Sequence, residues 1–174
     1  MRLNKYTISF FCLLFTHSVI SAPPVEVIDS CKNRQPSKST VTMTALPEPV
    51  KSTDEPNCNQ HYEASINNFD FGHITCNDVT SLIFNGNRYA LSSAVNYSAN
   101  PSIEPGISGI LALSNWWKIE YNNIAYFCLN TPLSPSGDGD NVLQHYLVEN
   151  VFNNGTPALY FYFFNKNIDP ISSV

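Results

Sequence analysis

A series of apolar, aromatic and β-branched runs, separated by asparagine-rich turns, constrains the fold more than any other feature of the chain. The clearest example is TSLIFNGNRYALSSAV (residues 80–95), in which Asn85-Gly86 separates two apolar runs. Both residues tolerate the positive φ of a type I′ turn, so this stretch predicts an antiparallel hairpin. Two further hairpins are predicted, one turning at Asn122-Asn123 and one at residues 153–155.

Other strand-like runs extend this series along the chain. With Phe71–Cys76 and Gly106–Ser114 included, strands recur about every 10–15 residues, which predicts an all-β fold, an antiparallel β-sandwich or partly closed barrel. The last run, Ala158–Phe164, is apolar on both faces and is expected inside a sheet, because an unpaired edge of this kind promotes aggregation. We expect no amphipathic helix after the first 22 residues, with a short helix at residues 59–68 as an alternative.

The first 22 residues have the pattern of a cleavable export signal. Arg2 and Lys5 precede the apolar run ISFFCLLFTHSVI, and Ile20–Ala22 offers a cleavage site after Ala22. The apolar run is too short for a transmembrane helix, which needs about 20 apolar residues. The sequence therefore predicts a secreted or periplasmic protein.

Residues 23–56 differ in composition from the rest of the chain. They contain six of the twelve prolines, and proline restricts its predecessor and lacks a backbone donor. We therefore expect an extended, Pro/Ser/Thr-rich arm, in which Ser39–Leu46 adds one edge strand. The predicted organisation is a signal (1–22), this arm (23–56) and an antiparallel β domain (57–174).

Four cysteines remain once Cys12 leaves with the signal. An even number in an exported chain predicts two disulfides. Three pairings are possible, and we favour Cys58–Cys76 with Cys31–Cys128, because the first pair is local and the second ties the arm to the β domain.

The stretch CNQHYEASINNFDFGHITC (residues 58–76) also allows a zinc site. Cys58, His61, His73 and Cys76 follow the pattern C-x2-H-x11-H-x2-C, and zinc takes four such ligands in a tetrahedron. The disulfide is favoured because an exported thiol pair meets oxidant before it meets free zinc. No metal and no cofactor is therefore expected.

The charge balance narrows the class of partner. Without Arg2 and Lys5 the chain has 7 basic and 14 acidic residues, a net charge of −7. Nucleic-acid binding and polybasic membrane contact both need clustered positive charge, which this chain lacks. An acidic surface favours a partner with a basic surface and speeds its encounter.

Each candidate catalytic pattern is incomplete. GISG (residues 106–109) lacks the spacing of a serine nucleophile elbow. His61, His73 and His145 lack the cationic help that a phosphate-cleaving site needs. Asp138 and Asp140 lack a facing second carboxylate for glycoside hydrolysis. Residues 134–141 concentrate oxygen ligands for calcium, but their spacing does not match an EF-hand.

We therefore expect a non-enzymatic protein that binds another protein, of the kind that includes inhibitors. In size, leader and cysteines the chain resembles small exported β domains, including periplasmic inhibitors and immunity-type proteins. The long loop Thr131–Asn141 is the favoured contact, and the predicted partner-binding residues are Asp138, Asp140, Asn141, Trp116 and Trp117.

Two alternatives remain open. A carbohydrate-binding module would use exposed aromatic residues. Because adjacent strand residues point to opposite faces, at most one of Trp116 and Trp117 is then exposed. A secreted hydrolase with a dispersed site would depend on His145. Asn96 and Asn154 are glycosylation acceptors only in a eukaryotic source.

Overall fold

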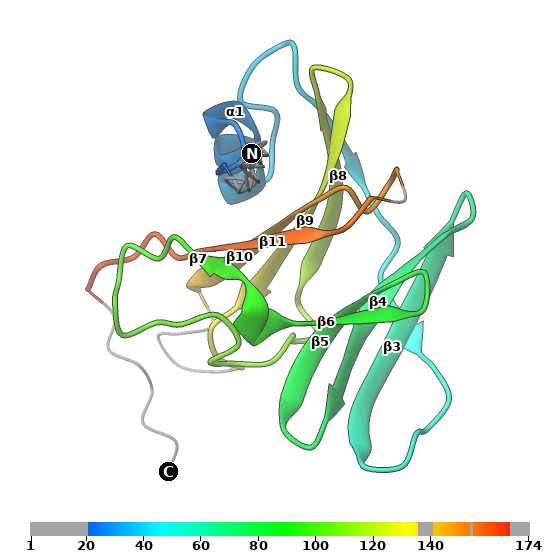
Figure 1. The fold of residues 1–174 in the computed structure, drawn as a ribbon. Helices are drawn as coiled ribbons and strands as arrows, with labels where there is room; N and C mark the ends of the chain where they lie inside the picture. The colour runs from blue at the N-terminus through cyan, green and yellow to red at the C-terminus, as the bar shows by residue number, and fades with distance from the viewer. Residues whose placement is uncertain (1–20, 136–140, 154, 168–174) are drawn as a thin grey trace, which may run out of the picture.

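The computed structural model describes residues 21–135, 141–153 and 155–167 and consists mainly of two β-sheets (Figure 1). The predicted export signal lies almost wholly in residues 1–20, outside this part of the chain. The six-stranded sheet has the order β1 (Thr42–Ala45), β8 (Asn115–Tyr121), β9 (Ile124–Pro132), β10 (Leu143–Glu149), β11 (Ala158–Tyr162) and β7 (Val95–Asn96).

The second sheet has five strands and is antiparallel throughout. Its order is β2 (Val50–Lys51), β3 (Cys58–Ile66), β4 (Phe69–Cys76), β5 (Val79–Phe84) and β6 (Asn87–Ala90). In the six-stranded sheet only β7 runs parallel to its neighbour, β11. The two sheets are not closed into a barrel. The prediction of a mainly β, antiparallel structure is confirmed at this level.

Asparagines set the tight turns between neighbouring strands. At residues 85–86 and 122–123 both central residues have positive φ, as a type I′ turn requires, and both predicted hairpins are present. The same backbone conformation joins β3 to β4 at residues 67–68 and β4 to β5 at residues 77–78. The third predicted hairpin is also present, between β10 and β11.

The expectation of no helix after the leader is wrong, because α1 spans Val25–Asn33. Pro24 occupies its N-cap, where the missing N–H of proline costs nothing. Val27 and Cys31, four residues apart, bury one side of the helix. The nine residues of α1 are fewer than the window in which a helical period stands out from the sequence.

Residues 34–57 contain no further helix and contribute two short strands. The predicted edge strand at residues 39–46 is confirmed as β1, which lies at the edge of the six-stranded sheet. The helix considered at residues 59–68 is wrong, since this stretch forms most of β3. The predicted division of the chain at residues 22 and 56 stays a prediction.

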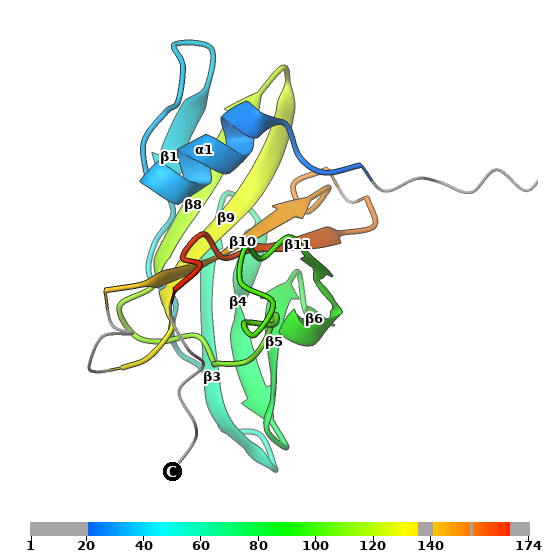
Figure 2. The same ribbon diagram turned by 90° about the vertical axis from the view of Figure 1, so that its left-hand side faces the viewer.

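The central strands of the six-stranded sheet are buried on both faces. Figure 2 shows α1 lying across the face that points away from the five-stranded sheet. Alternate residues of β9 serve the two sides: Phe127 and Leu129 join the core shared with the five-stranded sheet, whereas Tyr126 and Cys128 pack with the helix. The aromatic strand β11 lies between β10 and β7, inside the sheet as predicted.

Both favoured disulfides are present. Cys31–Cys128 joins α1 to β9 across 97 positions of sequence, and Cys58–Cys76 joins β3 to β4. Disulfides of this kind fit an extracellular location. Within the described ranges, α1 included, no helix has the length and apolar character needed to cross a bilayer.

Gly72 fixes the close approach of β3 and β4. A Cβ atom at this position would lie 2.0 Å from the backbone oxygen of Tyr62 and 2.8 Å from Cα of Glu63. Backbone atoms in a paired strand have little freedom to move, so we expect Gly72→Ala to lower the free energy of unfolding by about 1–3 kcal/mol. Urea unfolding measures this loss. Gly86→Ala serves as the comparison, because a Cβ atom at residue 86 would have no heavy atom within 4 Å, although the positive φ of Gly86 adds strain.

A variant Gly72→Ala as stable as the native protein would contradict this close packing of the two strands.

Candidate binding site between the two sheets

A cavity of about 180 Å³ opens where the two sheets diverge. Strand residues from both sheets form its walls, namely Gln60 and Tyr62 of β3, His73 of β4 and Trp116 of β8. Two connecting segments, residues 48–49 and 110–112, complete the lining among the described residues. The cavity therefore depends on the packing of the two sheets and not on one loop.

Strand alternation places the aromatic rings of the cavity in a row. Tyr62 and His73 are directly opposite each other across β3 and β4, and their rings stack with centroids 5.1 Å apart. The next ring is Trp116, stacked on His73 at 6.0 Å. Because Trp116 also contacts Phe71 and Phe127, the row leads from the hydrophobic core out to the cavity.

The imidazole of His73 is neutral at pH 7. Burial lowers its pKa to about 4, and the charge of His61 adds to the effect. Its Nδ1 atom is buried and has no hydrogen-bond partner among the described residues. Buried polar atoms nearly always have a partner, so this nitrogen is an exception, enclosed within the packed residues and closed to solvent.

The segment 106–114 lines one side of the cavity and is fixed to the six-stranded sheet. We predicted a strand here, which is wrong: the segment is irregular and turns at Gly106, whose φ is +79°. The N–H of Gly106 donates to the hydroxyl of Tyr146 at 2.9 Å, and the N–H of Leu111 donates to Oγ1 of Thr131 at 3.1 Å. These bonds hold the segment in place without strand pairing.

One carboxylate lines the cavity, and exposed apolar side chains lie in the adjoining segment of the chain. Glu48 is exposed and lines the cavity. Leu113 directly follows the lining residues 110–112 and is 76% exposed, and Ile107 of the same segment is 46% exposed. The segment 106–114 therefore combines cavity-lining residues with apolar side chains open to solvent.

The predicted partner-binding residues have different outcomes. Asp138 and Asp140 lie outside the described residues, and their role stays a prediction. Asn141 is exposed. Trp116 is only 5% exposed and belongs to the core, whereas Trp117 is half-buried on the opposite face, against the cluster under α1. The two tryptophans point to opposite faces, as strand alternation predicts.

The zinc alternative fails on geometry. Cys58 and Cys76 are bonded to each other, and the two histidines lie on opposite faces of the five-stranded sheet. His73 faces the cavity, whereas His61 faces outward, where its Nδ1 lies 3.0 Å from the carbonyl of Thr53 and its Nε2 contacts Glu63. No set of three or more potential ligands is grouped within the described ranges.

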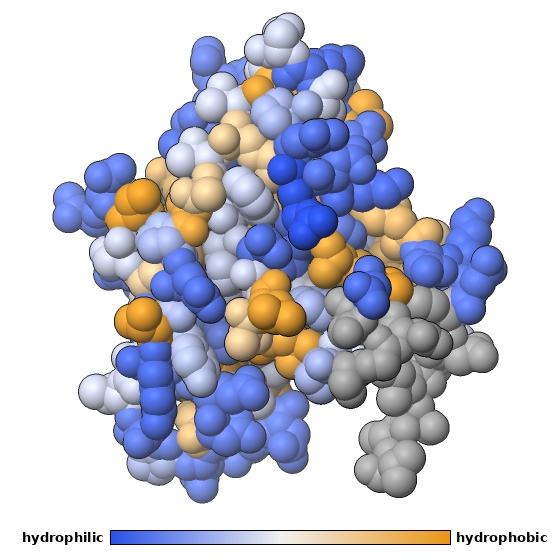
Figure 3. Space-filling view, turned by 180° about the vertical axis from the view of Figure 1, so that it is seen from behind, coloured by the Kyte–Doolittle hydropathy of each residue, from blue (hydrophilic) through white to orange (hydrophobic). Residues whose placement is uncertain are grey.

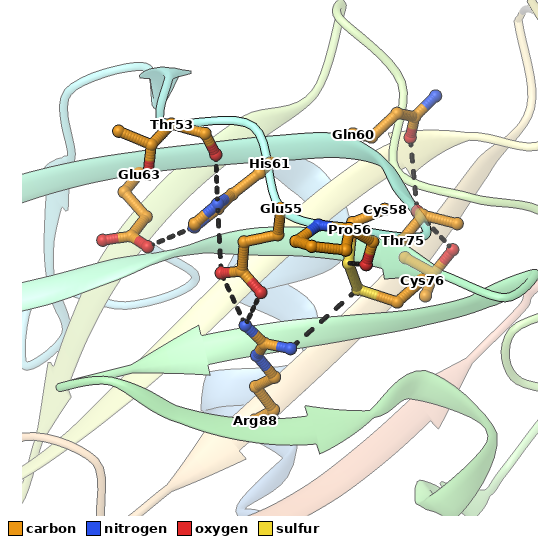
Figure 4. Close-up of a disulfide and its surroundings, with 11 residues drawn as sticks. Thr53, Glu55, Pro56, Cys58, Gln60, His61, Glu63, Thr75, Cys76 and Arg88 are labelled. Carbon is orange, nitrogen blue, oxygen red and sulfur yellow. Dashed lines mark hydrogen bonds and ion pairs between the residues drawn. A yellow bond between two sulfur atoms is a disulfide. The ribbon is translucent and has the colours of Figure 1, made fainter.

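The outward face of the five-stranded sheet is crossed by residues 52–57 (Figure 4). The carboxylate of Glu55 accepts two hydrogen bonds from Nη2 of Arg88, at 2.7 and 2.6 Å, and this contact lowers the pKa of Glu55. The N–H of Ser52 donates to the carbonyl of His61 at 2.8 Å. These contacts hold the crossing segment against the sheet.

His145 lies in a third environment, beneath α1. Its Nδ1 is 2.8 Å from Nδ2 of Asn130, which also donates to the carbonyl of Cys31 at 3.0 Å. Burial lowers the pKa of His145 to about 4, with Lys32 and Arg34 adding to the effect. The three histidines that we considered together as acid–base candidates thus occupy separate sites.

Comparison of the chain with models of protein families, with curated proteins and with solved structures gave no match. The functional argument consequently depends on the geometry of this chain alone.

Proposed function

We propose that this chain is an exported, non-enzymatic protein that binds another protein, using an open β-sandwich as its scaffold. In this proposal the surface around the cavity docks on the partner, and a partner side chain enters the cavity. The observation that carries the proposal is a preformed, ring-lined cavity whose lining segment, residues 110–112, continues directly into the exposed Leu113.

The size of the cavity supports a single side chain as its occupant. Pockets for cofactors and drug-sized ligands have volumes of about 300–1,000 Å³, whereas this one has about 180 Å³. Protein interfaces typically depend on a few anchor residues that fill such small pockets at the centre of the contact. The hydrogen bonds of Gly106 and Leu111 hold the cavity wall in place before binding, which reduces the entropy cost of association.

The lining chemistry supports binding over turnover. Among the described residues that line the cavity, none is a serine, threonine or cysteine that would act as a nucleophile. On the face shown in Figure 3, the apolar side chains form small separate clusters among hydrophilic ones. An interface with a local apolar anchor and a polar surround fits this surface.

The net charge of −7 that the chain has without Arg2 and Lys5 supports a partner with a basic surface. Asp138, Asp140 and Asn141 would add contacts from their loop. By this proposal the protein acts outside the cytoplasm, as periplasmic inhibitors and immunity proteins do. Carbohydrate binding is the second candidate, favoured by the ring row of Tyr62, His73 and Trp116.

Affinity capture from an extracellular extract of the source tests the proposal. The native protein is expected to retain a specific partner, and Leu113→Glu and Ala112→Trp are expected to reduce its recovery at least tenfold, since one variant places a charge next to the lining residues and the other fills the cavity mouth. Ile124→Glu is the matched control, because Ile124 is also exposed (47%) but lies at the β8–β9 turn.

Equal recovery by all four proteins would contradict the proposed docking surface. Recovery that free saccharide abolishes would favour the carbohydrate-binding alternative.

A further inference from the structure

We infer that the cavity between the sheets is a subsite for a cationic side chain, a lysine or an arginine of the partner. This inference rests on the proposed function and specifies which chemistry the cavity recognises. Three independent features carry it, namely the charge of the lining, the aromatic rings in the lining and the amide oxygen of Gln60.

The lining carries negative charge without a compensating cation. Glu48 is the charged residue of the described lining at pH 7, and no described lysine or arginine lines the cavity. The basic residues of the neighbouring strands are engaged elsewhere. Lys118 is 2.7 Å from Glu120, Arg88 is bonded to Glu55, and Lys51 is 3.0 Å from Asp54.

The ring faces suit an ammonium or guanidinium group. A cation within about 6 Å of a ring centroid is attracted by the negative face of the ring, most strongly for tryptophan and tyrosine. Tyr62 and Trp116 supply such rings at the cavity. The protein already uses this interaction elsewhere, with Nζ of Lys32 at 4.5 Å from the ring centroid of Phe164.

Gln60 adds a hydrogen-bond acceptor to the lining. Its amide oxygen, to which Thr75 donates at 3.4 Å, has a second lone pair available. Lysine and arginine are pure donors, so this acceptor suits them.

Other side chains fit less well. An acidic side chain would be repelled by Glu48, and a purely apolar one would make no use of Glu48 or of the amide oxygen of Gln60. The long unbranched stems of lysine and arginine can contact apolar walls such as Ile110 and Leu111 while the charged head reaches the polar end.

The test uses small probes on the full mature chain, observed by NMR. N-acetyl-arginine amide and N-acetyl-lysine amide are titrated separately, with N-acetyl-norleucine amide as an uncharged probe of similar stem. Both cationic probes are expected to shift the signals of the Trp116 indole and the His73 ring, with at least fivefold higher affinity than the norleucine probe. Added salt is expected to weaken their binding.

Glu48→Gln is expected to weaken the cationic probes about two- to fivefold. Glu48 is exposed, so the substitution should leave folding intact. Asp29→Asn is the matched control, because Asp29 is also exposed and lies on α1, across the six-stranded sheet. Ala112→Trp is expected to abolish the shifts by filling the cavity mouth.

Two results would overturn the inference: equal binding of the norleucine probe, or cationic probes that leave Trp116 and His73 unshifted. The outcome is separable from that of the proposed function. Partner capture that depends on Leu113, without cation binding in the cavity, removes this inference alone. Cation binding without any captured partner removes the proposed function and leaves the subsite.

Discussion

Replacing Cys31 and Cys128 together by alanine is expected to lower the free energy of unfolding by about 4–5 kcal/mol. The disulfide closes a loop with a sequence separation of 97, for which the chain-entropy model gives about 4.7 kcal/mol. Replacing Cys58 and Cys76 opens a loop with a separation of only 18, for which the same model gives about 3 kcal/mol. The long-range pair should therefore have the larger effect.

The environment of the long-range disulfide adds to this difference. Both of its cysteines are almost fully buried, between α1 and β9. Removing the sulfurs leaves a void beside Asn130, whose amide bonds the carbonyl of Cys31, and buried voids cost stability. Denaturant unfolding of the two alanine double variants measures the comparison. A smaller loss for Cys31/Cys128 than for Cys58/Cys76 would contradict it.

Acidification from pH 7 to pH 4 is expected to destabilise the protein by several kcal/mol through His73 and His145. Burial lowers the pKa of each from 6.5 to about 4 in the folded state. Between these pH values the unfolded chain binds more protons than the folded one, so stability falls as pH falls. Each histidine contributes about 3 kcal/mol that is present above pH 6.5 and lost by about pH 4.

Two carboxylates act in the same direction at lower pH, whereas burial raises the pKa of Glu149 and thereby opposes them. The hydrogen bond from Lys38 lowers the pKa of Glu26, and Arg88 lowers the pKa of Glu55, so protonation of either group removes a stabilising contact. Because both contributions are lost only as pH falls below the ordinary carboxyl range, the loss between pH 6.5 and 5 is assigned to the histidines.

Urea unfolding at a series of pH values measures the slope. With both histidines it should approach about 2.7 kcal/mol per pH unit, and His73→Phe should reduce it by about half while keeping the ring in the row. His145→Gln removes the other contribution and keeps a polar group near Asn130. A stability that is constant between pH 7 and pH 5 would refute the assignment.

The turns and the cysteines made much of the fold predictable. Asn85-Gly86 and Asn122-Asn123 marked hairpins because few residues adopt positive φ without cost. The preference for Cys31–Cys128 followed from one local pair and one distant pair, and the structure has this pairing. Strand alternation alone predicted that Trp116 and Trp117 lie on opposite faces of their strand, and the structure has this arrangement.

Helix α1 and the segment 106–114 were not predictable in the same way. Nine residues with two preceding prolines show too little periodicity, and the helix is stabilised by its packing on a distant sheet. In GISGILALS the apolar residues suggest a strand, but Gly106 turns the chain and side-chain hydroxyls satisfy its backbone. Both outcomes depend on tertiary contacts that a local pattern does not contain.

One sequence signal indicates part of the cavity wall. Asn67-Asn68 is a two-residue turn, and counting back from it sets Tyr62 opposite His73 on the same face. Counting along these strands does not place Trp116 or Glu48 at the cavity, because their positions depend on how the two sheets pack together.

The link between Cys31 and Cys128 also bears on survival among extracellular proteases. Residues 34–40, which follow α1, are exposed and contain Arg34 and Lys38, two sites of the kind that trypsin-like enzymes cut. A cut after either residue would break the backbone and still leave the helix covalently attached to β9. The two pieces of the nicked chain would stay covalently joined, and α1 would still cover the six-stranded sheet. Cleavage of this exposed connection would therefore leave the fold intact.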